Sequence, residues 1–128
     1  MQTKISAMRL AWFWLPVITY AGAIFFFSSL SHPEELAPSL FKIVGDKFLH
    51  LIEYGILGIL CYRAFRHAAG RWGEHYALGL AILAGTLYGV TDEVHQSFVP
   101  SRESSGLDVL ADAVGATLAS VGWHWRVK

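Results

Sequence analysis

The feature that most constrains this chain is an uncharged, apolar run over residues 10–30. It spans 21 residues and contains neither an acid nor a base. A helix needs about 20 apolar residues to cross a hydrocarbon core about 30 Å thick, so this run predicts a transmembrane helix. The composition agrees, because only 16% of the residues are charged, against about 25% in an average soluble domain. We therefore expect an integral membrane protein.

Three further stretches have helical length and apolar character, over about 46–65, 76–98 and 106–126. Each contains ionisable residues, so its signal is weaker than that of the first run. Together the four stretches predict an all-α, polytopic membrane bundle of four transmembrane helices, forming one domain over 1–128. A secretory signal peptide is the alternative for 10–30, but the apolar part of a signal peptide is shorter, about 7–15 residues.

The distribution of Lys and Arg predicts the orientation. Four spans place both termini on the same side, and that side holds seven of the ten basic residues. Short cytoplasmic flanks carry the excess of positive charge, so both termini are expected in the cytoplasm, with the chain in the bacterial plasma (inner) membrane. All five Trp residues fall at or near this basic side. No basic patch has the spacing that nucleic acid requires, so nucleic acid is not an expected partner.

Ionisable and amide side chains gather at one level of the last three predicted helices. These helices alternate in direction, so residues far apart in sequence meet near the outer surface. Ionisable groups inside membrane helices are costly and usually face one another within the bundle. We therefore expect one group of side chains, called the polar cluster below, consisting of Asp46, His50, Glu53, Asp92, Glu93, Gln96, Asp108 and Asp112.

Small residues on two predicted helices favour close packing beside this cluster. Gly85 and Gly89 are four residues apart, and a second row runs through Gly115, Ala119 and Gly122. Such rows let helix backbones approach closely within a membrane. The last three predicted helices are therefore expected to form the walls of the polar cluster.

Arg102 is the one cation in the loop over 97–107, on the same side as the acids. Its fork of donors suits a carboxylate or a phosphate. We predict that Arg102 lies within hydrogen-bond reach of an acid, either Glu93 or Asp108. Contact with a lipid phosphate is the alternative role.

Three motifs occur in order along the chain: Asp46-Lys47-x-x-His50-x-x-x-Tyr54, Asp92-Glu93-x-x-Gln96-x-x-x-Pro100-x-Arg102 and Asp108-x-x-x-Asp112-x-x-Gly115. In this order, and with four predicted spans, the sequence resembles the VanZ-like family of bacterial membrane proteins. The resemblance implies a role in the cell envelope and a relation to glycopeptide (teicoplanin) resistance proteins. It names no reaction. Family members often have Asn where this chain has Asp112, which adds an acid here.

Two interpretations of the polar cluster remain open. In the first, His50, Glu53 and Glu93 perform acid/base catalysis on a lipid or lipid-linked envelope precursor. The residues that bind the headgroup are then Asp46, Lys47, Tyr54, Asp92, Gln96, Arg102, Asp108 and Asp112. In the second, the protein is not catalytic, and the cluster holds the bundle together or forms an interface with a membrane partner protein.

No metal and no other cofactor is expected. Metal-binding bundles carry paired Glu-x-x-His motifs, whereas His50 and Glu53 form a single pair in reversed order. The expected partners are membrane lipids. Whether a reaction takes place, and on which lipid, does not follow from the sequence.

Overall fold

The chain folds into helices, as a computed structural model shows for residues 4–102 and 104–128. Four helices are long: α1 (Ala7–Ser28), α3 (Asp46–Ala68), α4 (Gly70–Gln96) and α5 (Gly106–Arg126). Two are short, namely the 3-10 turn η1 (Pro33–Glu35) and α2 (Pro38–Val44). The described residues form no strand, which confirms the all-α prediction.

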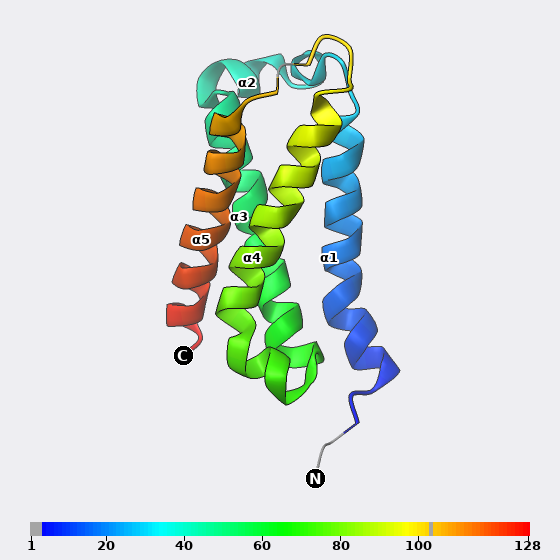
Figure 1. The fold of residues 1–128 in the computed structure, drawn as a ribbon, viewed down its shortest axis with the longest axis vertical. Helices are drawn as coiled ribbons and strands as arrows, with labels where there is room; N and C mark the ends of the chain where they lie inside the picture. The colour runs from blue at the N-terminus through cyan, green and yellow to red at the C-terminus, as the bar shows by residue number, and fades with distance from the viewer. Residues whose placement is uncertain (1–3, 103) are drawn as a thin grey trace.

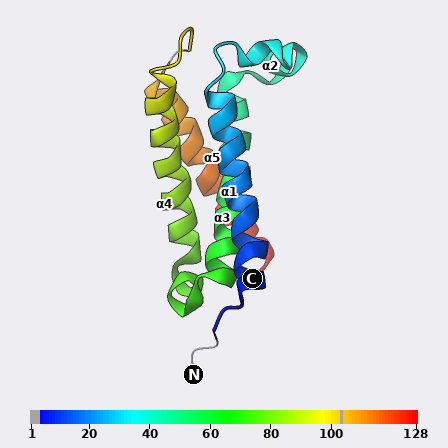
Figure 2. The same cartoon turned by 90° about the vertical axis from the view of Figure 1, so that its right-hand side faces the viewer.

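The four long helices lie alongside one another in a bundle (Figure 1). Helix α2 and the loop that joins α4 to α5 lie together at one end, called the α2 end below. Helix α1 begins and α5 ends at the opposite end. Figure 2 shows α2 projecting sideways from the α2 end, roughly across the direction of the bundle.

Local sequence signals explain where the long helices begin. The Ser6 side chain accepts a hydrogen bond from the Arg9 N–H at 3.2 Å, and the Ser105 side chain accepts one from the Leu107 N–H at 3.1 Å. Both serines therefore satisfy an N–H group that the first helical turn leaves free. Helix α4 begins at Gly70, six residues before the predicted start at 76. Charged residues there end the apolar run but do not break a helix.

Small residues bring α3, α4 and α5 into close contact. A Cβ atom built on Gly58 of α3 would lie 2.7 Å from the Ser120 Oγ atom and 2.9 Å from the Ala116 carbonyl oxygen of α5. One built on Gly85 of α4 would lie 2.8 Å from the Ala116 Cβ atom. Real Cβ atoms essentially never come this close to a neighbour. The predicted packing function of the small residues is therefore confirmed at Gly58 and Gly85, but Gly122 has open space around it.

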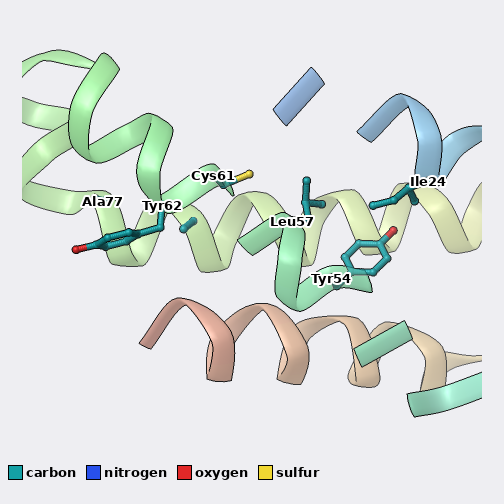
Figure 3. Packing of buried hydrophobic residues seen from close by; sticks show 7 residues of the cluster. Ile24, Tyr54, Leu57, Cys61, Tyr62 and Ala77 are labelled. Carbon is teal, nitrogen blue, oxygen red and sulfur yellow. The ribbon is translucent and has the colours of Figure 1, made fainter. Parts of the chain in front are cut away.

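The apolar core follows α3 along the bundle. Figure 3 shows its members in a row, from Tyr62 and Ala77 at one end to Ile24 and Tyr54 at the other. Helix α1 joins this core through Ile24, which is 2% exposed. Long polar side chains also fix α1 in place, because the Tyr20 hydroxyl donates to the Glu53 carbonyl oxygen at 3.0 Å.

The outer surface of the bundle is strongly apolar. Three helices, α1, α3 and α4, are long and apolar enough to cross a membrane among the described residues. Helix α5 is not one of them, because Asp108, Asp112 and Arg126 lower its average hydropathy. Three of the four predicted spans are therefore long and apolar enough to cross a membrane, which supports a membrane protein.

Candidate functional site

The polar cluster assembles at the α2 end from three different helices. His50 of α3, Asp92 of α4 and Asp112 of α5 are 5%, 7% and 0% exposed. One ligand-type atom from each of these three side chains lies within 4.8 Å of the other two. The expectation that residues far apart in sequence share one level is therefore met. His95 lies outside this group, since its Nε2 atom pairs with the Ser29 hydroxyl at 3.0 Å.

His50 pairs with Asp112 rather than with Glu53. The His50 Nδ1 atom and the Asp112 Oδ1 atom are 2.9 Å apart, and both side chains are buried. Asp112 Oδ2 has no hydrogen-bond partner among the described residues. It faces α4, because a Cβ atom on Gly89 would lie 2.9 Å from it. Gly89 is therefore the residue that gives the Asp112 carboxylate its space.

Two further contacts hold neighbouring elements together around this pair. Lys47 forms an ion pair with Asp108, whose side chain is 3% exposed. The Ser105 backbone N–H donates to the Glu93 carboxylate. These contacts join α3 to α5 and α4 to the start of α5. Lys47, Glu93 and Asp108 therefore have structural partners within the chain.

The predicted pairing of Arg102 with an acid is wrong for the residues that the structure describes. Its Nη1 atom donates to the Leu30 carbonyl oxygen at 3.2 Å and to the Phe27 carbonyl oxygen at 3.4 Å. These carbonyls lie at the end of α1, where a helix leaves its last C=O groups without intrahelical partners. Glu93 and Asp108 instead have the partners Ser105 and Lys47. Arg102 thus ties the loop to α1.

A cavity of about 370 Å³ lies between α1, α2 and α3 and reaches the polar cluster. Apolar side chains from these helices form most of its wall, among them Ile24, Phe27, Leu36, Leu40, Phe41, Leu49 and Ile52. Asp46, His50, Glu53, Asp92, Gln96 and Arg102 form its polar part. The cavity thus has an apolar region beside a polar one.

The sequence predictions missed the walls that α1 and α2 contribute. Tyr20 and Phe27 of α1 and Leu40 of α2 line the cavity, but neither helix contains an acid or a histidine that would mark a site. Tyr54, predicted to bind a headgroup, is 0% exposed and lies in the apolar core.

Glu53 and Asp92 differ from the other acids of the polar cluster. Both line the cavity, and neither carboxylate has a Lys, Arg or His nitrogen within 4.0 Å in the described part of the chain. The Asp92 Oδ2 atom accepts a long hydrogen bond of 3.5 Å from the Gln96 side chain. Two carboxylates without an ion-pair partner within 4.0 Å therefore line the same cavity, although a His50 nitrogen lies within 4.8 Å of Asp92.

A second, polar crevice of about 230 Å³ adjoins this cavity at the α2 end. Its lining includes Glu34, Asp46, Asp108 and Arg102. A backbone hydrogen bond at Glu34, assisted by the neighbouring His32, lowers the pKa of the Glu34 carboxyl. Glu34 is therefore ionised at neutral pH and adds a carboxylate to the lining of the crevice.

Two groups of side chains have the donor atoms for a metal ion. The first consists of Asp46, His50 and Asp108, and the second of His50, Asp92 and Asp112. One imidazole with two carboxylates is a donor set that Zn²⁺ and similar divalent ions accept. In the first group Asp108 is already paired with Lys47, which leaves the second as the better arrangement. The sequence expectation of no metal remains a prediction.

Comparison with known proteins gives one match. The family model described as VanZ/LLP1 matches residues 5–126. No curated protein and no solved structure matches the chain. Because the family model covers nearly the whole chain, and the chain also carries the three motifs at the polar cluster, this protein belongs to the VanZ/LLP1 family.

Proposed function

We propose that this protein binds a lipid, or a lipid-linked envelope precursor, in the cavity between α1, α2 and α3. The observation that carries the proposal is the mixed lining of the cavity. Ile24, Leu40 and Ile52 offer an apolar wall, while Glu53 and Arg102 lie on the polar side. An apolar pocket with a few convergent polar groups is the usual form of a small-molecule site. A lipid matches both parts, with its chain on the apolar wall and its headgroup at the polar cluster.

We propose further that all four long helices span the bacterial plasma membrane. Asp108 and Asp112 lower the average hydropathy of α5, but both face inward, where they are 2% and 0% exposed. Its outward residues Leu110, Val114 and Leu118 are 58%, 38% and 62% exposed. A membrane helix is judged by the face that meets lipid, and this face of α5 is apolar.

The proposed topology has both termini in the cytoplasm. Helix α1 begins and α5 ends at the same end of the bundle (Figure 1), and that end carries seven of the ten Lys and Arg residues. Exposed Trp12, Trp72 and Trp125 lie near the same end, where an aromatic belt favours the membrane interface. Reporter fusions after Lys128 and within the segment 33–39 should report opposite sides of the membrane. The same side for both would reject four spans.

Lipid binding is tested by filling the cavity. Ala23 lines it, so Ala23→Phe should reduce the amount of lipid retained by the purified protein, as measured by native mass spectrometry in mild detergent. Ala11→Phe is the matched control, because Ala11 is also exposed on α1 but does not line the cavity. Equal lipid retention by both variants and the unmodified protein would contradict the proposal.

The second interpretation, a purely structural polar cluster, is favoured by specific contacts at His50, Asp108 and Asp112. These side chains connect α3 to α5. The same contacts leave Glu53 as the cavity-lining carboxylate best placed for acid/base chemistry, since Glu93 is bonded to Ser105. His50 thus ties two helices and also lines the cavity, whereas Glu53 and Asp92 line the cavity without an ion-pair partner among the described residues.

Catalysis is tested with the conservative change Glu53→Gln. Glutamine keeps the shape of glutamate but does not take up a proton near neutral pH. If the protein processes a lipid, the lipid profile of the Glu53→Gln strain should match that of a deletion strain and differ from that of the wild type. The expression and the thermal stability of the variant should stay normal. A normal lipid profile would favour binding without catalysis. Teicoplanin sensitivity of the same strains tests the proposed relation to glycopeptide resistance.

A further inference from the structure

We infer that the lipid headgroup is zwitterionic, with a primary ammonium group held by Glu53 and Asp92 and a phosphate held by Arg102. The inference rests on the proposed function, because it names the headgroup that the same cavity would receive. The three residues line one cavity and come from three separate segments, namely α3, α4 and the loop after α4.

The carboxylates provide the first argument. Among the described residues, Asp108 and Asp112 each have a cationic or imidazole partner at short range, whereas Glu53 and Asp92 have none within 4.0 Å. Asp92 is 7% exposed. A buried carboxylate without a cation is costly, so a positively charged ligand relieves that cost. A primary ammonium brings three donors, enough for both carboxylates.

Arg102 provides the second argument. It lines both the apolar cavity and the adjoining polar crevice. Its Nη1 atom donates to the Phe27 and Leu30 carbonyl oxygens at the end of α1, which holds the guanidinium in the lining of the cavity. Its Nε and Nη2 donors form no hydrogen bond within the described residues. A guanidinium presents paired donors that match a phosphate, so these two remain for the ligand.

Charge and donor geometry distinguish this headgroup from its common alternatives. An anionic headgroup such as phosphatidylglycerol would place its hydroxyls beside Glu53 and Asp92 without neutralising them. A choline headgroup carries the positive charge, but its methyl groups donate no N–H hydrogen bond to either carboxylate. Phosphatidylethanolamine supplies the charge, the donors and the phosphate together, and it is therefore the probe for this site.

The test compares phosphatidylethanolamine, phosphatidylcholine and phosphatidylglycerol with identical acyl chains. Each competes for the full-length protein in mild detergent, and bound lipid is counted by native mass spectrometry. Chelator is present throughout, so that no metal ion bridges a phosphate to the acids. We expect phosphatidylethanolamine to bind about tenfold more tightly than phosphatidylcholine, which corresponds to about 1.4 kcal/mol.

Variants assign the preference to the named residues. Glu53→Gln and Asp92→Asn should each reduce the preference for phosphatidylethanolamine over phosphatidylcholine, and Glu74→Gln, at the opposite end of the bundle, should not. Thermal unfolding shows which variants are folded. If only one of the two carboxylate variants folds, that variant is enough to test the inference. Arg102→Gln should weaken binding of all three lipids, because each carries a phosphate.

The outcomes separate this inference from the proposed function. Equal or tighter binding of phosphatidylcholine or phosphatidylglycerol, with binding still lost in Ala23→Phe, would overturn the ammonium inference and leave lipid binding in place. Lipid retention that Ala23→Phe does not change would overturn the proposed function itself. A preference for phosphatidylethanolamine that persists in both Glu53→Gln and Asp92→Asn would reject the assigned carboxylates.

Discussion

Gly115→Ala should destabilise the bundle much more than a methyl group normally does. The Cβ atom of an alanine at this position would overlap the Leu51 carbonyl group and lie 2.9 Å from the Leu51 Cα atom. These atoms are helix backbone, so no side-chain rotation removes the overlap. Helices α3 and α5 must separate instead, and the separation also stretches the contact between His50 and Asp112.

The magnitude follows from two opposing terms. Overpacking a tight contact costs about 1–3 kcal/mol, and the upper part of this range applies here because the obstacle is backbone. Replacing Gly by Ala within a helix returns up to about 1 kcal/mol. We therefore expect a net loss of about 2 kcal/mol for Gly115→Ala. Gly122→Ala on the same helix meets nothing within 4 Å and should be neutral or stabilising by up to about 1 kcal/mol.

Thermal unfolding in detergent measures both variants, with the five Trp residues as the fluorescence signal. At about 4 °C per kcal/mol, the Gly115→Ala midpoint should fall by about 8 °C, while the Gly122→Ala midpoint stays level or rises. Equal midpoints for the two variants would show that α3 and α5 do not pack as closely as described. The close approach of the two backbones would then be refuted.

Three other changes test separate contacts by the same unfolding assay. Asp112→Asn should change the free energy of unfolding by less than about 1 kcal/mol, because an amide still pairs with His50. Asp112→Ala should cost about 2–4 kcal/mol, because it leaves a buried imidazole nitrogen unpaired. Similar losses for the two variants would reject the pairing of Asp112 with His50. Lys47→Met should cost about 1–2 kcal/mol. This is less than for a fully buried ion pair, because Lys47 is half exposed although its partner Asp108 is buried. No loss of stability would show that the ion pair contributes nothing. Gly45→Ala should cost about 1–3 kcal/mol, because φ is 84° and ψ is 153° at this position, a region that residues with a Cβ atom avoid. An unchanged midpoint would show that Gly45 does not join α2 to α3 in this conformation.

The sequence predicted the long helices well because their signals are local. Each apolar run that predicts a long helix is contained within one continuous stretch of the sequence. For His50 and Asp112, the sequence predicted only that they lie at the same depth in the bundle, because the alternating directions of the helices determine depth. Which acid would become the partner of His50 depends on rotation of α5 about its axis, and no short-range pattern encodes that rotation.

Arg102 shows why the rest was not predictable. Only charged partners were predicted for Arg102, because a carboxylate is a stronger acceptor than a backbone carbonyl. In the structure, Arg102 instead donates to the Phe27 and Leu30 carbonyl oxygens at the end of α1, and a backbone carbonyl gives no signal in the sequence. The cavity was missed for the same reason. Its walls come from apolar residues of α1 and α2, and apolar residues give no hint of an enclosed space.

The apolar row from Tyr54 to Ala77 has a consequence for the energetics of this protein (Figure 3). It fills the bundle below the polar cluster, and among the described residues its members include no acid, base or amide. A charge is costly in such an apolar layer, so we expect the cluster to exchange protons and ions with the α2 end. On the proposed topology, the pH and the salt on that side of the membrane alone set the charge of the cluster.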